Sequence, residues 1–171
     1  QERTSVFLDY RTLGYFIGDG SNNFLLTEDK VNTFYDELKL DLPIERISNV
    51  SMKPFMFEET YNNDSIEYYS KLCRTKYFVS IANRVGQAAF DAASANCIVF
   101  GNSNSKLHSL LCHPFTLMNE EIKIDDIKNK INTLENDQSL CMEILDKQNE
   151  YLFKTCVEHP QNVFKKALEL K

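Results

Sequence analysis

No apolar run in the 171-residue sequence approaches the length that a membrane-spanning helix requires. Its hydrophobic content of 43% and its mean hydropathy of -0.38 are typical of a soluble globular protein. Low-complexity linkers and internal repeats are also missing. Because this length suffices for one layered domain but not for two ordinary ones, we expect residues 1–171 to form a single domain.

An excess of basic charge is also absent. The chain carries 19 Lys and Arg residues against 25 Asp and Glu residues, which gives a formal net charge of -6. Proteins that bind nucleic acid along its phosphate backbone need clustered basic side chains, because counterion release drives that binding. The charge balance therefore argues against nucleic acid as a partner, although a local basic pocket is compatible with it.

The five cysteines lack the CxxC pairing that is typical of metal sites and redox motifs. Their number is odd, and we interpret them as reduced thiols in a cytoplasmic protein. Cys112, His113 and His108 lie close together in the sequence, but adjacent residues point in different directions and no second ligand pair accompanies them. Packing or solvent exposure is favoured over zinc, and we expect no metal.

Strands and helices alternate along the predicted order of elements. Residues 4–18 are predicted to form one or two strands, and residues 27–40 a helix that Thr27 caps and Pro43 ends. The alternation continues with a strand at 44–52, a helix at 64–75, a strand at 76–82, a helix at 86–95, a strand at 97–101 and a helix at 105–112. Asp64 or Ser65 would cap the helix at 64–75, whose apolar stripe is Ile66, Tyr69, Leu72 and Cys73.

The chain is predicted to be helical from about residue 120 to residue 171. Asp137 or Ser139 would cap one helix of this tail, and Pro160 would begin the last. The alternation before the tail implies right-handed βαβ units and a mainly parallel sheet covered on both faces. We therefore expect a three-layer, Rossmann-like α/β fold that binds ligands beyond the carboxyl ends of its strands.

The stretch "NRVGQAAFDAASANCIVFG", residues 83–101, places polar residues where such a fold binds ligands. A helix N-terminus offers unpaired N–H groups, and Gly86 lets a ligand approach closely. Asn83 and Asp91 could face one elongated ligand, with Arg84 as a charge for phosphate and Gln87 as a neutral partner. Spacing alone leaves another interpretation open, in which Asn83 only caps the helix and Asp91 pairs with a lysine.

This stretch resembles a signature in the C-terminal half of glycosyltransferases with two Rossmann-like domains, the GT-B fold, especially the retaining family-4-like enzymes. That signature is a glutamate, Gly-Phe-Gly, a few apolar residues, a second glutamate, Ala-Met-Ala, a small pair, Pro and an apolar strand. Asn83 falls at the first glutamate, Gly86 at the second glycine and Asp91 at the second glutamate. Cys97 and Ile98 replace the usual Gly and Pro. The resemblance covers residues 64–113, and the rest of the chain agrees by element order alone.

The resemblance implies the nucleotide-sugar-binding half of a hexosyltransferase, with a nucleotide diphosphate sugar as the donor substrate and no other cofactor. In that family the first acid hydrogen-bonds hydroxyls of the sugar, and the second holds the ribose. A basic residue after the first strand holds the pyrophosphate, for which Arg11 is the candidate, while the "IGDG" segment at 17–20 is a weaker one. No residue is assigned as catalytic. The acceptor would bind an N-terminal domain that this chain does not include.

A function of another class fits the same sequence. The apolar residues of the tail recur at helical spacing. The chain could therefore be a non-catalytic α/β protein-interaction domain whose helical tail docks a partner, although such a stripe also suits packing onto its own domain.

Overall fold

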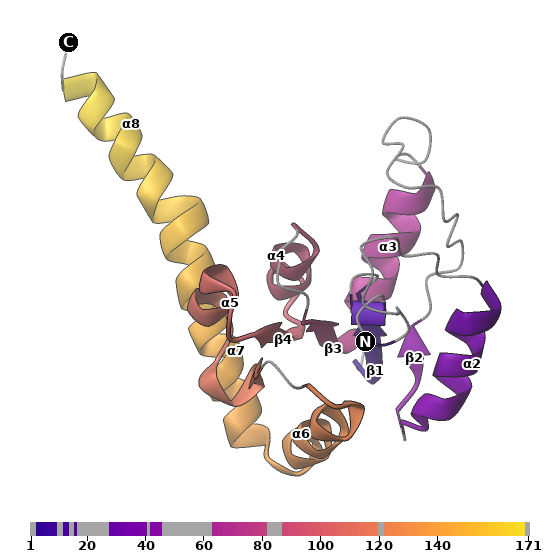
Figure 1. Cartoon of the computed structure of the whole chain (residues 1–171). Helices are drawn as coiled ribbons and strands as arrows, with labels where there is room; N and C mark the ends of the chain where they lie inside the picture. Colours follow the sequence, from indigo (N-terminus) through magenta and orange to yellow (C-terminus); the bar gives the residue numbers. More distant parts are fainter. Residues whose placement is uncertain are drawn as a thin grey trace.

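The computed structural model describes residues 3–9, 12–13, 16, 28–40, 42–45, 63–81, 87–119 and 122–169. Its centre is a parallel sheet with the strand order β2-β1-β3-β4-β5 (Figure 1). The strands are β1 (Ser5–Leu8), β2 (Ile44–Glu45), β3 (Thr75–Ser80), β4 (Ile98–Asn102) and β5 (Leu117–Met118). Helices cover both faces, which confirms the expected three-layer, Rossmann-like α/β fold.

The two faces of the sheet have different helical covers. Alternate strand residues such as Val6 and Val79 face α2 (Glu28–Leu38) and α6 (Ile124–Asn136), and we call this side the α2/α6 face. The intervening residues, such as Phe78, face the opposite side. That side, the α3/α4/α5 face, is covered by α3 (Asn63–Arg74), α4 (Gln87–Ser94) and α5 (Lys106–Leu111).

Small side chains seat α4 closely on the sheet, as the sequence predicts. Ala89, Ala92 and Ala93 are fully buried against the α3/α4/α5 face. Gly101 permits a similar approach of α5 to β4. A Cβ atom at this position would lie 2.7 Å from Cγ of His108 and 2.9 Å from Sγ of Cys112, so only glycine fits without a shift.

Helix α7 (Gln138–Phe153) passes from one face of the sheet to the other, beside the part of β4 that the short strand β5 leaves unpaired. Asp137 caps α7, because its Oδ1 accepts a hydrogen bond from the Leu140 amide at 2.9 Å. The first half of α7 buries Ile144 on the α2/α6 face, and the second half packs Tyr151 on the opposite face. The helix therefore links both cores.

Gln148, where α7 passes β4, completes the hydrogen bonds of that strand. Its Nε2 donates to the Cys97 carbonyl at 2.8 Å, and its Oε1 accepts from the Val99 amide at 2.9 Å. β5 pairs with β4 only at Gly101 and Asn102. The carboxamide of Gln148 thus supplies the bonds that a longer β5 would otherwise make.

Several predicted boundaries are wrong. Thr12, Leu13 and Phe16 are helical rather than extended, and the Leu13 amide donates to the Asp9 carbonyl four residues earlier. Helix α2 ends at Leu38, where Lys39 takes a positive φ of 43°, and not at Pro43. The predicted capping residue Thr27 and the strand residues beyond Glu45 lie outside the described residues.

Helix α3 also begins earlier than predicted and turns another face to the core. It starts at Asn63, so Asp64 and Ser65 lie inside its first turn. Leu72 is fully buried, but Tyr69 is 48% exposed and Cys73 is exposed. Tyr68 packs on the core instead.

Two short elements complete the β4–β5 connection and were missing from the sequence prediction. Pro114–Thr116 form a 3-10 turn, η1, which leads directly into β5. β5 contains two residues, too few for a periodic pattern in the sequence. The Ser103 amide donates to the Met118 carbonyl at 2.8 Å and extends this short pairing.

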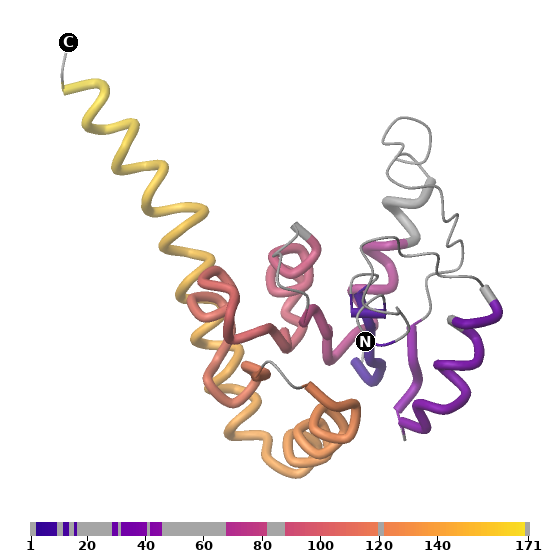
Figure 2. The backbone as a smooth tube through the Cα atoms, viewed as in Figure 1, coloured from indigo at the N-terminus to yellow at the C-terminus, as the bar shows by residue number. Residues whose placement is uncertain are grey.

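The tail ends in a helix that begins at His159, one residue before the predicted start at Pro160. A π-helical turn, η2 (Lys154–Glu158), joins α7 to α8 (His159–Glu169) without a break (Figure 2). The His159 amide donates to the Lys154 carbonyl five residues earlier, and this wider turn accommodates Pro160, which has no amide proton to donate. Among the described helices, none is long and apolar enough to cross a membrane.

Candidate functional site

The strand order places a switch point between β1 and β3. The chain that leaves β1 returns through α2 on one face, whereas the chain that leaves β3 returns through α4 on the other. In such sheets the two connections diverge, and ligands bind in the crevice beyond the carboxyl ends of the two strands. We call this end of the sheet the carboxyl edge.

Asp9 and Ser80 meet at the switch point. Asp9 follows β1 directly, and its amide donates to the Val79 carbonyl at 2.9 Å. The hydroxyl of Ser80, the last residue of β3, donates to Oδ2 of Asp9 at 3.0 Å. Ser80 is 1% exposed and Asp9 is partly exposed. The hydrogen bond from Ser80 therefore fixes the position of the Asp9 carboxylate at the carboxyl edge.

Tyr68 of α3 and Asp91 of α4 extend this group on the α3/α4/α5 face. Burial raises the pKa of the Tyr68 hydroxyl well above its ordinary value, and the carboxylates of Asp91 and Asp9 raise that pKa further. Both carboxylates thus act on one phenol. The hydroxyl oxygen of Tyr68 is buried, and it has no hydrogen-bond partner among the described residues.

Ile81, which follows β3, is held by one side chain from the segment after β1 and one from the end of β4. Its amide donates to Oγ1 of Thr12 at 3.1 Å, and its carbonyl accepts from Nδ2 of Asn102 at 3.0 Å. The Thr12 hydroxyl donates in turn to the Val79 carbonyl at 2.9 Å. All three residues are buried.

His108 lies behind Asn102 and is neutral. The Asn102 amide donates to Nδ1 of His108 at 3.0 Å, which places the imidazole proton on Nε2. Nε2 is buried and finds no partner in the described part of the chain. Burial lowers the pKa of His108 to about 4.

A pocket of about 860 Å³ lies further along the carboxyl edge, between β5 and α6. Its polar lining includes Asn104, Asn119 and Asn129, and Asp126 and Lys130 supply one charge of each sign. Lys130 already donates to the Phe115 carbonyl and lies 4.8 Å from the centre of that ring. The pocket is therefore polar, with balanced charges.

The structure places only part of the predicted site. Asp91 lies in the middle of α4, where its charge acts on Tyr68, and Gln87 begins α4, although the side chain of Gln87 is not described. The other predicted site residues, Arg11, Asn83, Arg84 and Gly86, lie outside the described residues, as does the "IGDG" segment.

Sequence reasoning missed Asp9, Ser80 and Tyr68. A signal for Asp9 exists in the sequence, since it is the first charged residue after a buried apolar strand. Ser80 and Tyr68 carry no such signal, because their importance depends on partners 71 and more than 20 residues away in the chain.

The three residues weighed as metal ligands lie in different environments. Nδ1 of His113 accepts from the Phe115 amide, and its Nε2 lies 3.1 Å from Oε1 of Glu143. His108 and Cys112 pack instead on Gly101. Across the described ranges, no three His, Cys, Asp or Glu side chains are grouped as a metal site requires. All five cysteines are free thiols.

Comparisons of the chain with protein-family models, with curated proteins and with solved structures found no match. Function must therefore be inferred from the residues at the carboxyl edge and from the physical chemistry of the fold.

Proposed function

We propose that the chain is the nucleotide-sugar-binding part of a retaining glycosyltransferase, which transfers a hexose from a nucleotide diphosphate sugar to an acceptor. The observation that carries this proposal is the hydrogen-bonded pair of Asp9 and Ser80 at the switch point of a parallel sheet, with Tyr68 of the α3/α4/α5 face within the electrostatic reach of both Asp9 and Asp91. Carboxylates accept hydrogen bonds from vicinal hydroxyls, which both the ribose and the hexose of such a donor carry.

The direction of α4 supports the same ligand class. Its N-terminus lies at the carboxyl edge, where the partial positive charge of the helix favours a diphosphate. In the proposed enzyme, this helix end and Arg84 or Arg11 stabilise the leaving diphosphate as its charge grows in the transition state. Asp91 holds the ribose, while Asn83 and the Gly86 backbone orient the sugar. An N-terminal domain binds the acceptor and closes the cleft. The enzyme works in the cytoplasm.

Titration calorimetry tests the donor site directly. We expect weak binding of UDP-glucose, GDP-mannose or a related donor to this chain, and little turnover without the second domain. Asp91→Ala should weaken binding about tenfold or more, because a charged acceptor is lost. Asp146→Ala, which removes an exposed carboxylate from α7, is the matched control and should leave binding unchanged. Absence of heat with every donor would refute the proposal, as would unchanged binding in Asp91→Ala.

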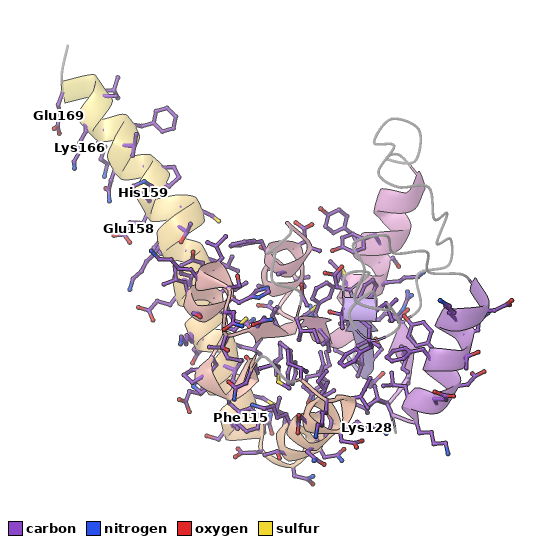
Figure 3. The ribbon with its side chains drawn as sticks, in the orientation of Figure 1. Phe115, Lys128, Glu158, His159, Lys166 and Glu169 are labelled. Atoms are coloured by element: carbon purple, nitrogen blue, oxygen red, sulfur yellow. The ribbon has the colours of Figure 1, made fainter. Side chains whose placement is uncertain are left out.

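A second candidate is the non-catalytic interaction domain, and the exposure of the tail favours it. Phe164 and Leu168 are each 70% exposed, and Val163 is 52% exposed. Figure 3 labels His159, Lys166 and Glu169 on α8, and no other described helix or strand lies beside this end of the tail. These apolar side chains gain nothing from their own domain.

Sedimentation of the wild type and of a Phe164→Glu, Leu168→Glu variant tests the second candidate for self-association through the tail. A concentration-dependent mass that the double variant abolishes would support docking by α8. A monomeric wild type that binds a donor nucleotide would instead favour the transferase.

A further inference from the structure

We infer that Thr12 and Asn102 are positioning residues for ligand binding at the switch point, acting through the backbone of Ile81. This inference rests on the proposed function. Neither residue is among those that the sequence assigns to the site.

The backbone of Ile81 lies just beyond the regular ladder of the sheet. The last pairs of β3 are Val79 with Leu8 on one side and Ser80 with Gly101 on the other. At Ile81 two side chains take over, one from each side: Oγ1 of Thr12 accepts its amide proton and Nδ2 of Asn102 donates to its carbonyl. Both polar groups of the Ile81 backbone are thereby satisfied without strand pairing.

Side-chain bonds have a different consequence from ladder bonds at this position. A further ladder pair would keep the neighbouring chains parallel and close the space between them. Because side chains hold Ile81 instead, the chains that follow β1 and β4 are free to turn away while the end of β3 stays fixed. The end of β3 thus has a defined position at the carboxyl edge, as a binding site there requires.

Each of the two side chains is fixed in turn. The Thr12 hydroxyl also donates to the Val79 carbonyl at 2.9 Å, so it bridges the backbone groups of Val79 and Ile81. Oδ1 of the Asn102 side chain accepts a hydrogen bond from the backbone amide of Asn104 at 2.9 Å. The backbone amide of Asn102 donates to Nδ1 of His108. Thr12 is fully buried and Asn102 is 3% exposed, so neither rotates freely into solvent.

The chain offers a matched control for Thr12 at the opposite end of β3. Thr75 is also fully buried, and its hydroxyl donates to the Lys71 carbonyl at 2.9 Å. The Thr75 bond is local, over four residues, whereas the Thr12 bond spans 67. Thr12→Val and Thr75→Val each delete one buried hydroxyl, and only the first lies at the carboxyl edge.

The experiment measures donor affinity and urea stability for wild type, Thr12→Val, Thr75→Val and Thr12→Ser, with the best-binding donor among UDP-glucose and GDP-mannose. Both valine variants should lower the urea midpoint. Thr12→Val should weaken donor binding roughly tenfold, whereas Thr75→Val should stay within about twofold of wild type. Thr12→Ser keeps the hydroxyl and should restore most of the affinity.

A second matched pair covers the case in which Thr12→Val does not fold. Asn102 and Gln148 are both buried carboxamides that bond two backbone groups, at opposite ends of β4. Asn102→Ala should weaken donor binding, whereas Gln148→Ala should not. Equal affinities in Thr12→Val and Thr75→Val, or in the two alanine variants, would overturn the inference and leave the proposed function standing. A wild type that binds no donor would instead refute the proposed function, and the positioning role with it.

Discussion

The amino and carboxyl ends of the sheet differ in the groups that their polar side chains bond. At the amino end, donors serve helix carbonyls: Arg3 donates to the Ala95 carbonyl after α4, and the Ser5 hydroxyl donates to the Arg74 carbonyl of α3 at 3.0 Å. At the carboxyl end the Ser80 hydroxyl donates to the Asp9 carboxylate, and the charges of Asp9 and Asp91 both act on Tyr68. The cations of the amino end, Arg3 and Arg74, bond a helix carbonyl and the Glu45 carboxylate, whereas a neutral hydroxyl holds Asp9.

The direction of the helices explains this difference. In a parallel α/β fold each connecting helix returns from the carboxyl end to the amino end, so helix carbonyls collect at the amino end and helix N–H groups at the carboxyl end. At the amino end the chain satisfies these groups itself. The comparison teaches that the polarity of the fold fixes where donors and acceptors belong, before any ligand is considered. Three further variants test this distinction.

Gln148→Ala should lower the stability more than the other two variants and should leave donor binding at the carboxyl edge unchanged. The variant leaves the Val99 amide and the Cys97 carbonyl without their partner in a buried place. At about 1–3 kcal/mol for each group, we expect the free energy of unfolding to fall by about 4 kcal/mol in urea titrations. The exposed neighbour Asn149→Ala is the control and should change little. A loss below about 1 kcal/mol would mean that water replaces the carboxamide.

Acid should lower the free energy of unfolding through protonation of His108. Its pKa is lowered to about 4 in the fold, against an ordinary value of about 6.5 in the unfolded chain. Between these pH values the unfolded state binds a proton that the folded state does not. Stability from this group is therefore complete above about pH 6.5, falls as the pH drops, and levels off near pH 4, with a total loss of about 3 kcal/mol.

His108→Asn isolates this contribution, since an amide oxygen can accept from the Asn102 amide but does not titrate. Urea titrations from pH 7.5 to pH 4 should show a shallower decline for the variant than for wild type. Parallel curves for the two proteins would show that His108 does not set the acid sensitivity.

Ser5→Ala should have the smallest effect of the three. It removes one buried hydroxyl from a helix carbonyl at the amino end, and a neutral hydrogen bond of this kind contributes about 1 kcal/mol. Thermal unfolding should record a small drop in midpoint, with donor binding unchanged. Ser109→Ala, whose hydroxyl is on an exposed residue and donates to the Ser103 carbonyl, should be nearly neutral. A reversed order would contradict the view that the amino end depends on such donors.

Local patterns predicted the elements that are long and periodic. The alanines of α4, the buried run of β3 and the cap at Asp137 lie where the sequence places them. The errors occur where the pattern is short or has two readings. β5 has two residues, and residues 12, 13 and 16 are helical in a stretch whose β-branched and aromatic composition predicts strands.

The candidate site was harder to predict than the fold. Asp91 could be chosen because it lies on a helix whose start is visible in the sequence. Asp9 becomes a site residue only through Ser80, 71 positions later, and Thr12 becomes one only through Ile81. No local pattern encodes such pairs, because they form when separate strands align.

The sequence by itself determined the alternation of strands and helices, the burial of the strands and the helical nature of the tail, because these follow from propensity and period over a few residues. Only the tertiary structure decided the strand order, the hydrogen bond between Asp9 and Ser80, and the use of Gln148 as a substitute for strand pairing. Each of these depends on which distant segments pack together. Hydrogen bonds and burial between such segments arise from the whole fold and not from any one stretch of chain.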